Sequence, residues 1–326
     1  MYNYTALQWI FIFFFFSFFG WVWECIYIWI QDKVLTNRGF MRGPFLPLYG
    51  TGGLMLLFVS MPVRDSIVLT FLVGSISATI LEFITGITME ALFKVKYWDY
   101  SFLKIQYKGI ISLLSSLAWG GMTVFLNKLL YPFVHSYVIA NIPIRVLNVV
   151  TILLIIGTSA DFALSFKAAI DLRDILVKLE KAKKEMERIQ KRLDVLIAVA
   201  GDGLENAKDS VGEKIVAAKD AAGEKISGVK EAAVSRIDVL TDNLEDKFRV
   251  LREKLKRNPS MYAENEKDEL SELRGNFIAQ KTQKNEIGKL RGFIQRGILR
   301  GNPNITSSQY AEELETLKKN FNEKEE

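Results

Sequence analysis

Long apolar runs fill the first half of the chain and are almost absent from the second half. They lie at about residues 7–30, 45–62, 66–93, 109–131 and 144–166. Each run is near the ~20 residues that a helix needs to cross ~30 Å of hydrocarbon. The sequence therefore predicts a transmembrane domain, residues 1–166, with about five helices. The second run is the shortest and contains Pro47, so we expect a broken or re-entrant segment there.

The rest of the chain has apolar positions at helical spacing among many charges. From Ala207 it carries an eleven-residue repeat with Ile215, Ile226 and Ile237 at the ninth position. Eleven residues make three turns at about 3.67 residues per turn, so one apolar stripe persists along a helix. We predict an amphipathic helical tail over residues 167–258 and a charged helical C-terminal segment over residues 259–326. The fold class is therefore all-α, a polytopic membrane protein followed by a long helical or coiled tail.

The amphipathic tail has more than one possible partner. Its stripe could lie on an anionic membrane, with lysines on both sides, or could pack against a second copy or another helical protein through residues 167–258. A loosely ordered, solvated helix fits the pattern as well. Arg291, Arg296 and Arg300 form a basic cluster, but no known motif accompanies them, so nucleic-acid binding is not favoured.

Basic residues set the expected orientation of the membrane domain. They concentrate in the loops after the first and third runs and in the tail, whereas the second loop has only Arg64. The two basic loops hold Lys33, Arg38, Arg42, Lys94, Lys96, Lys104 and Lys108. The positive-inside rule then predicts an outside N-terminus and a cytoplasmic tail. We expect a multi-pass protein of the bacterial inner membrane, in contact with the lipid bilayer.

Three carboxylates interrupt the apolar runs. Glu24 lies in the first run, and Glu82 and Glu90 lie in the third. A carboxylate at bilayer depth costs roughly 2.5 to 3.5 kcal/mol even on lenient scales, and such residues mark candidate functional sites. Helical rise places Glu24 roughly 9 Å, Glu82 roughly 16 Å and Glu90 roughly 5 Å from the cytoplasmic ends of their helices. The three acids predict one polar membrane site that is reached from the cytoplasm.

The neighbouring loops offer partners for these acids. Arg38 and Arg42 could face Glu24 or Glu90, and Asp99 adds another carboxylate at the inner boundary. Simpler explanations remain open. Glu24 and Glu82 could belong to a structural hydrogen-bond network, Glu90 could reach water at the interface, and Trp98 and Tyr100 could be interfacial anchors.

Some chemistries receive no support from the sequence. Cys25 and His135 are the single cysteine and the single histidine of the chain, so a Cys/His zinc site is not expected. No G-x-x-x-x-G-K-[ST] phosphate loop occurs, so the chain is not its own ATPase. We predict no metal and no cofactor, and no pair of nucleophile and base indicates an enzyme.

Several short motifs occur in a fixed order within residues 5–165. They are Gly20-Trp-Val-Trp-Glu24, Asn37-Arg-Gly39, Gly43-Pro44, Pro47-Leu-Tyr-Gly50, Glu82, Glu90, Trp98-Asp-Tyr-Ser101 and Trp119-Gly120. As a set they resemble the bacterial family named putative ABC-transporter type IV, often labelled ABC transporter permease. The resemblance covers the membrane domain only. Family members usually have an Asn and a Gly-Arg after the Trp-Asp-Tyr motif, where this chain has Gln106 and Gly109-Ile110.

The resemblance implies a membrane transport component that works with a separate ATPase subunit. Its motif residues in this chain are Asn37, Gly39, Gly43, Pro44, Pro47, Tyr49, Gly50, Trp98 and Tyr100. The leading hypothesis is therefore a transport component whose polar site consists of Glu24, Glu82, Glu90, Arg38, Arg42 and Asp99. Two alternatives are a membrane-anchored scaffold or assembly factor that acts through its tail, and a membrane enzyme acting on lipid headgroups.

Overall fold

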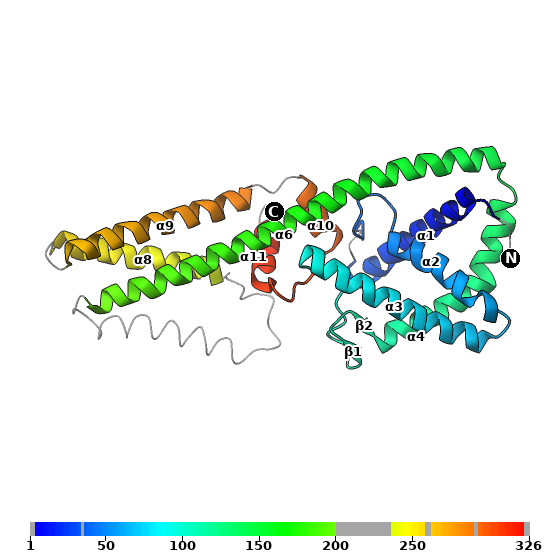
Figure 1. The fold of residues 1–326 in the computed structure, drawn as a ribbon, viewed down its shortest axis with the longest axis horizontal. Coiled ribbons are helices and arrows are strands. Elements are labelled where there is room, and N and C mark those ends of the chain that lie inside the picture. The colour runs from blue at the N-terminus through cyan, green and yellow to red at the C-terminus, as the bar shows by residue number, and fades with distance from the viewer. Residues whose placement is uncertain (1–3, 34–35, 200–235, 258–261, 290–292, 323–326) are drawn as a thin grey trace. The chain divides into compact units, whose positions relative to one another are not determined.

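The computed structural model describes residues 4–33, 36–199, 236–257, 262–289 and 293–322, and nearly all of them are helical (Figure 1). The helices are α1 (Ala6–Asp32), α2 (Pro47–Ser60), α3 (Ile67–Phe93), α4 (Leu113–Phe125), α5 (Tyr131–Phe133), α6 (Ile144–Val199), α8 (Arg236–Arg257), α9 (Glu264–Lys289), α10 (Phe293–Gly301) and α11 (Ala311–Asn322). Two short strands, β1 (Gln106–Tyr107) and β2 (Ile111–Ser112), form an antiparallel hairpin. The predicted all-α class is confirmed.

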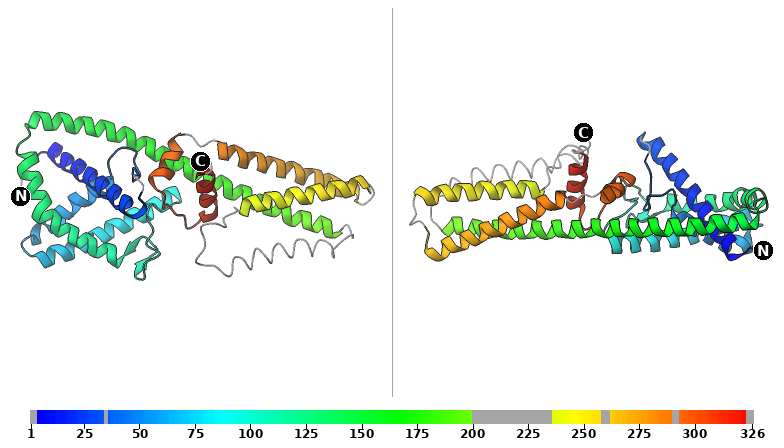
Figure 2. Two further views of the ribbon diagram at one scale, coloured as in Figure 1. Left: turned by 180° about the vertical axis from the view of Figure 1, so that it is seen from behind. Right: turned by 90° about the horizontal axis from the view of Figure 1, so that it is seen from above.

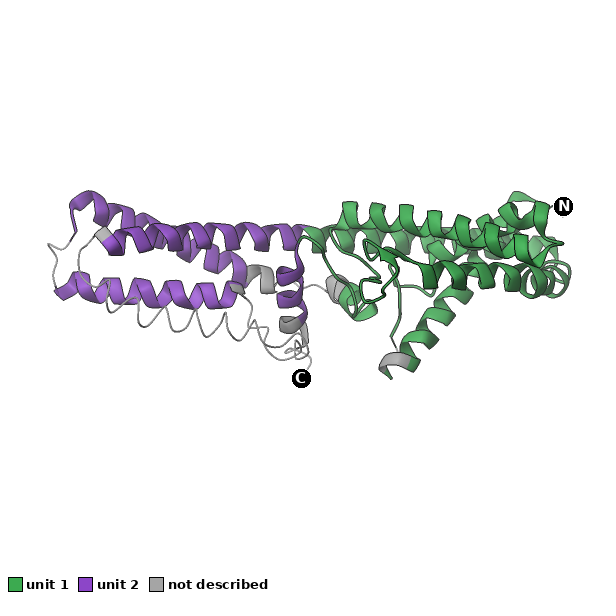
Figure 3. Ribbon diagram, turned by 90° about the horizontal axis from the view of Figure 1, so that it is seen from below, with its two compact units in different colours: residues 1–173, 292–309 green, residues 174–291, 310–326 purple. Residues whose placement is uncertain are grey.

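The chain divides into two compact units (Figure 3). Unit 1 contains residues 1–173 and 292–309, and unit 2 contains residues 174–291 and 310–326. A short piece of the C-terminal region therefore belongs to the same unit as the membrane helices. Helix α6 runs without a break from Ile144 to Val199, through residue 166, where the sequence places the end of the last span.

Four helices of the described residues are long and apolar enough to cross a membrane. They are Ala6–Ile30, Ile67–Phe93, Leu113–Ile139 and the apolar part of α6, and a shorter apolar helix covers Pro47–Val63. Ile76, Ile80 and Ile84 of α3 are each more than half exposed, as expected for side chains that face lipid. The chain is a membrane protein, and its described residues contain four long apolar helices and one short one. The short one lies at the shortest of the five predicted runs.

The fourth apolar helix begins and ends later than the run at residues 109–131. Ser112 starts it, because the Ser112 hydroxyl accepts a hydrogen bond from the Ser115 amide at 3.0 Å, while the Ser115 side chain accepts one from the Ser112 amide at 3.1 Å. Residues 109–112 belong instead to the hairpin and its turn. The helix continues to Ile139 through two π-helical stretches, Leu126–Leu130 and Val134–Ile139.

Small residues bring the membrane helices into contact. An added Cβ at Gly74 of α3 would lie 2.1 Å from the Thr123 hydroxyl of α4, and one at Gly120 of α4 would lie 2.2 Å from the Ser75 hydroxyl of α3. Because no real contact is that short, both positions require glycine. Small residues at helix interfaces are typical of membrane proteins, where close backbone approach stabilises the bundle.

Two loops lie at one end of the membrane helices. The first, residues 36–46, precedes α2 and follows α1, and the second, residues 94–112, joins α3 to α4. Both α1 and α3 stop at a lysine in the left-handed conformation, Lys33 (φ 57°) and Lys94 (φ 61°). The amide of Leu46 in the first loop donates to the carbonyl of Ser17 at 3.0 Å, which holds this loop against α1. We call this end of the membrane helices the loop end.

Unit 2 is a bundle of helical segments around an apolar core. The second half of α6 lies beside α8 and α9 in each view (Figures 1 and 2). The core of unit 2 contains Met186, Ile189, Leu193, Leu196, Ile237, Leu244, Leu251, Tyr262, Leu270 and Phe277. Buried positions of α8 recur every seven residues at Ile237, Leu244 and Leu251, the spacing of helices that pack side by side. The three eleven-residue repeats lie outside the described residues except for the end of the third.

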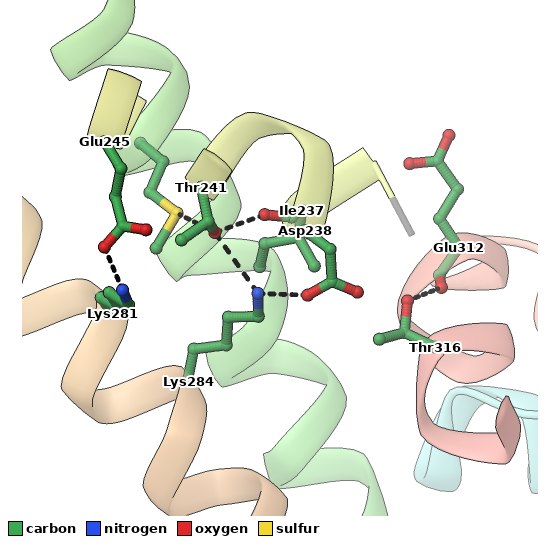
Figure 4. Close-up of polar contacts among 9 residues, drawn as sticks. Ile237, Asp238, Thr241, Glu245, Lys281, Lys284, Glu312 and Thr316 are labelled. Atoms are coloured by element: carbon green, nitrogen blue, oxygen red, sulfur yellow. Dashed lines mark hydrogen bonds and ion pairs between the residues drawn. The ribbon is translucent and has the colours of Figure 1, made fainter. Parts of the chain in front are cut away.

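Charged pairs flank the core of unit 2. The Lys284 ammonium of α9 reaches both the carboxylate of Asp238 and the hydroxyl of Thr241 on α8, and Lys281 pairs with Glu245 one turn away (Figure 4). On the other flank Arg192 of α6 pairs with Glu269 of α9. Helix-to-helix pairs of opposite charge favour one pairing of the segments, although each exposed pair contributes only about 0.2–1 kcal/mol.

Candidate functional site

Glu24 of α1 has two partners at the loop end. The Tyr49 hydroxyl of α2 donates to Glu24 Oε1 at 2.5 Å, and Arg38 Nε of the first loop lies 3.8 Å from Glu24 Oε2. The side chains of Arg38 and Glu24 are 12% and 26% exposed. Arg38 Nη2 also donates to the Tyr97 carbonyl at 3.0 Å, which ties the first loop to the second. Glu24 is therefore a partly buried carboxylate with a cationic partner.

Glu82 of α3 is more deeply buried, at 5% exposure. The Tyr100 hydroxyl of the second loop donates to Glu82 Oε1 at 2.9 Å. The Ser115 hydroxyl of α4 lies 3.3 Å from Glu82 Oε2 and shares its proton with the Ser112 carbonyl at 2.9 Å. These partners are neutral, and no ion pair of Glu82 occurs among the described residues. The two acids thus sit in different electrostatic surroundings.

The two carboxylates belong to one cluster. The ring of Tyr49, whose hydroxyl reaches Glu24, packs against the ring of Trp119 of α4 at a centroid distance of 5.4 Å. Trp119 lies one helical turn beyond Ser115 on α4, and Ser115 contacts Glu82. We call Glu24, Arg38, Tyr49, Glu82, Tyr100 and Ser115 the acid cluster.

Gly20 lets Tyr49 reach Glu24. An added Cβ at Gly20 of α1 would lie 2.2 Å from Tyr49 Cγ and 2.4 Å from Tyr49 Cβ. Only glycine leaves room for the tyrosine ring against the backbone of α1. Gly20 and Glu24 are four residues apart and share one face of the helix, so the ring that covers Gly20 directs its hydroxyl to Glu24.

The first loop is held by hydrogen bonds around Asn37. The Trp21 indole N–H donates to Asn37 Oδ1 at 2.6 Å, and Asn37 Nδ2 donates to the carbonyl of Arg42. The amide of Gly43 donates to Asp161 Oδ2 of α6 at 2.8 Å. These contacts fix a loop that Gly39, at φ 132°, and Pro44 keep out of helical conformation. The loop then presents Arg38 to Glu24.

The second loop places Tyr100 over Glu82. The Trp98 indole N–H donates to the Ile110 carbonyl at 2.9 Å, and the Tyr100 amide donates to the Gly109 carbonyl at 2.8 Å. Gly109 has φ 70°, and an added Cβ there would lie 2.2 Å from Asp99 Oδ1, so this turn needs glycine. Burial raises the pKa of the Tyr100 hydroxyl, and the Glu82 carboxylate raises it further, so Tyr100 stays protonated and donates.

Asp99 has its own partners in the second loop and in the C-terminal region. Its Oδ1 accepts from the Ser101 amide at 2.9 Å and the Ser101 hydroxyl at 2.5 Å, and its Oδ2 accepts from the Thr306 hydroxyl at 3.1 Å. Burial by itself would raise the pKa of Asp99, but these hydrogen bonds and the nearby Lys96 outweigh it and hold the pKa below its usual value. Asp99 is therefore an ionised anchor of the second loop.

Two other predicted members of the site are placed apart from the acid cluster. The Glu90 side chain is half-buried, and among the described residues of unit 1 it has no hydrogen-bond or ion-pair partner. Arg42 lies beside α10, where a Cβ added to Gly297 would be 3.8 Å from Arg42 Nε. The structure thus brings together Glu24, Arg38 and Glu82, and it does not join Glu90 or Arg42 to them.

Sequence reasoning assigned no role at the acids to three residues that contact them. The sequence indicates Tyr49 as a motif residue and Tyr100 as a motif or interfacial residue, and it predicts no role for Ser115. The pattern Ser112-x-x-Ser115 is a helix-start signal, and it could have placed Ser115 on the first turn of α4. Among the described residues, no group of three or more His, Cys, Asp or Glu side chains could hold a metal ion.

Comparison with known families gives a match over the membrane domain. Residues 11–166 match the family described as putative ABC-transporter type IV. The match confirms the resemblance carried by the motifs, from the Phe-rich start of α1 to the end of the apolar part of α6. It supports an ABC-transporter-type membrane component. No curated protein and no solved structure matches the chain.

Proposed function

We propose that this protein is the membrane component of a transport system and that the acid cluster lines its pathway. The observation that carries the proposal is Glu82, a 5% exposed carboxylate on an apolar helix whose partners include the neutral hydroxyls of Tyr100 and Ser115. Bundle stability does not require this group, because an apolar residue would avoid its desolvation cost.

The charge of the cluster suggests what it accepts. Glu24 and Glu82 contribute two negative charges when both are ionised, and Arg38 contributes one positive charge. A net negative site at this depth favours a proton or a cation over an anion, because either would offset the cost of the unpaired carboxylate. Arg38 then pairs with Glu24 and leaves Glu82 for the transported or coupled species.

The direction of access and the energy source are further parts of the proposal. The loop before α2 and the loop after α3 are both rich in Lys and Arg, which supports a cytoplasmic loop end and an inner-membrane location. The acid cluster would then open to the cytoplasm. Because the chain has no phosphate loop, energy from ATP would come from a separate ATPase subunit.

A complementation experiment tests the proposal. In a strain that lacks this protein, we expect Glu24→Gln and Glu82→Gln to lose function, because glutamine keeps the shape but removes the charge. Glu90→Gln is the matched control: it is the same substitution on the same helix, eight residues from Glu82 and outside the cluster, and we expect it to keep function. If Glu82→Gln were silent while deletion of residues 167–326 abolished function, the transport proposal would be wrong and a scaffold acting through its tail would replace it.

A further inference from the structure

A short C-terminal segment is bound to both loops of the loop end. We define the strap as residues 301–307, which begin at the last residue of α10 and belong to unit 1. Asn302 and Ile305 are 1% and 0% exposed, and Ser307 is 6% exposed. A segment without regular structure that buries polar side chains this fully needs partners for them, and both loops supply those partners.

The strap pairs with the second loop like an added strand. The Lys96 amide donates to the Thr306 carbonyl at 2.7 Å, and the Thr306 amide donates to the Lys96 carbonyl at 3.0 Å. The Ser307 hydroxyl donates to the Lys94 carbonyl at 2.6 Å, and the Thr306 hydroxyl donates to Asp99. These contacts hold the backbone before Tyr97 and the side chain of Asp99 after it, and the Tyr97 carbonyl accepts from Arg38.

The other end of the strap holds the first loop. Asn302 Nδ2 donates to the Gly39 carbonyl at 2.9 Å. A Cβ added to Gly301 would lie 2.7 Å from the Asn37 carbonyl oxygen, so the two backbones are in close contact. Gly39 directly follows Arg38, and Asn37 precedes it. The strap therefore fixes the backbone on both sides of the arginine that pairs with Glu24.

We infer that the strap is an intramolecular regulatory element that closes the acid cluster. Its docking positions Arg38 over Glu24 and braces the loop that brings Tyr100 to Glu82, and its release frees both loops. The piece of unit 1 that contains the strap, residues 292–309, is joined to unit 2 along the chain at both of its ends, so a change in the tail can act on the membrane site through the chain itself. The strap lies outside the matched residues 11–166, so this control is added to the family domain. That the strap regulates transport rests on the proposed function, but that the strap closes the acid cluster does not.

Thiol labelling of the purified full-length chain in lipid nanodiscs tests this inference. The native thiol is removed by Cys25→Ser, and Ser115→Cys reports access to the acid cluster. The released strap carries Asn302→Ala, Thr306→Ala and Ser307→Ala together, and the matched control is Ser308→Ala, an exposed neighbouring hydroxyl. We expect the released strap to speed labelling of Ser115→Cys by about tenfold or more, because each lost hydrogen bond favours the open state, and we expect no change with the control.

Two further measurements make the result decisive. Ser60→Cys, at a 0% exposed position away from the loop end, should stay unreactive, which shows that the bundle remains folded. If it becomes reactive, Thr306→Val replaces the triple variant, since it keeps the strand pairing and loses only the Asp99 contact; a smaller increase of about threefold is then expected. Hydrogen exchange of residues 37–43 and 94–101 reports whether the strap has released the loops.

The outcomes separate this inference from the transport proposal. If the loops exchange faster but labelling of Ser115→Cys is unchanged, the strap only braces the loops and the inference is wrong. If neither changes, these contacts do not hold the strap, which also overturns it. Labelling measures access and not transport, so a silent Glu82→Gln in complementation would remove the proposed function and leave the strap intact.

Discussion

Gly20 gives a sharp test of how the acid cluster is built. Replacing Gly20 with alanine places a methyl group where three atoms of Tyr49 already lie, 2.2 to 2.6 Å away. Carbon atoms do not approach this closely, so the ring must move. Overpacking of this kind costs about 1–3 kcal/mol. If the ring also leaves Glu24, the loss of a hydrogen bond to a charged group adds about 1.5–3 kcal/mol.

Thermal unfolding of the purified protein in detergent measures the effect. Gly20→Ala should lower the Tm, and it should lower it more than Tyr49→Phe, which removes the hydroxyl and leaves the ring. Gly121→Ala on α4 is the matched control because no heavy atom lies within 4 Å of its added methyl group. That substitution should leave the Tm unchanged or raise it, since alanine is a better helix former than glycine by about 1 kcal/mol. A Gly20→Ala protein as stable as the unaltered protein would refute this account of the site.

Arg38→Met should lower stability by about 1–3 kcal/mol because the Glu24 carboxylate loses its cationic partner, with solvent screening limiting the loss. Adding Glu24→Gln should recover part of the Tm. Because the pKa of Asp99 is lowered in the folded protein, its contribution to stability should be complete above about pH 4 and disappear as the pH falls through the lowered pKa. Hydrogen exchange of residues 94–101, corrected for the intrinsic rate, should become faster in acid as this stability is lost. Asp99→Asn should remove that pH dependence. In unit 2, Leu244→Ala should destabilise the helical bundle by about 2–5 kcal/mol, whereas Val250→Ala at a half-exposed position of the same helix should change it little, as measured by exchange of α8 amides in the full chain.

Local patterns predicted the membrane helices well because each depends on nearby residues. The apolar runs around Phe16 and Ile76 exceed the length of a bilayer crossing, and no tertiary contact is needed to recognise them. The start of the fourth helix was misplaced because hydropathy does not register Ser112. Residues 109–112 are apolar enough to extend the run, but the reciprocal Ser112–Ser115 cap begins the helix only at Leu113.

The partners of the acids depend on tertiary structure and were harder to predict. Glu24 and Glu82 stood out because carboxylates are rare in apolar helices, but the hydroxyls that bind them come from separate elements. Tyr100 is an ordinary interfacial residue by its sequence position. The Tyr100 amide donates to the carbonyl of Gly109, a residue with positive φ, and this contact helps to position Tyr100 at Glu82. The geometry of loops is therefore the part that hydropathy could not supply.

The strap also changes how a deletion of the tail must be interpreted. Removing residues 167–326 takes away unit 2, but it also takes away Asn302, Thr306 and Ser307, which contact the loops of the membrane domain. Loss of function after that deletion could arise from either loss, so it favours a scaffold only when the acids are silent as well. The triple alanine variant of the strap removes the loop contacts and leaves unit 2 in place. A phenotype shared by this variant and the deletion would assign the effect of the tail to the acid cluster, because three side chains in unit 1 would then account for the loss of the whole tail.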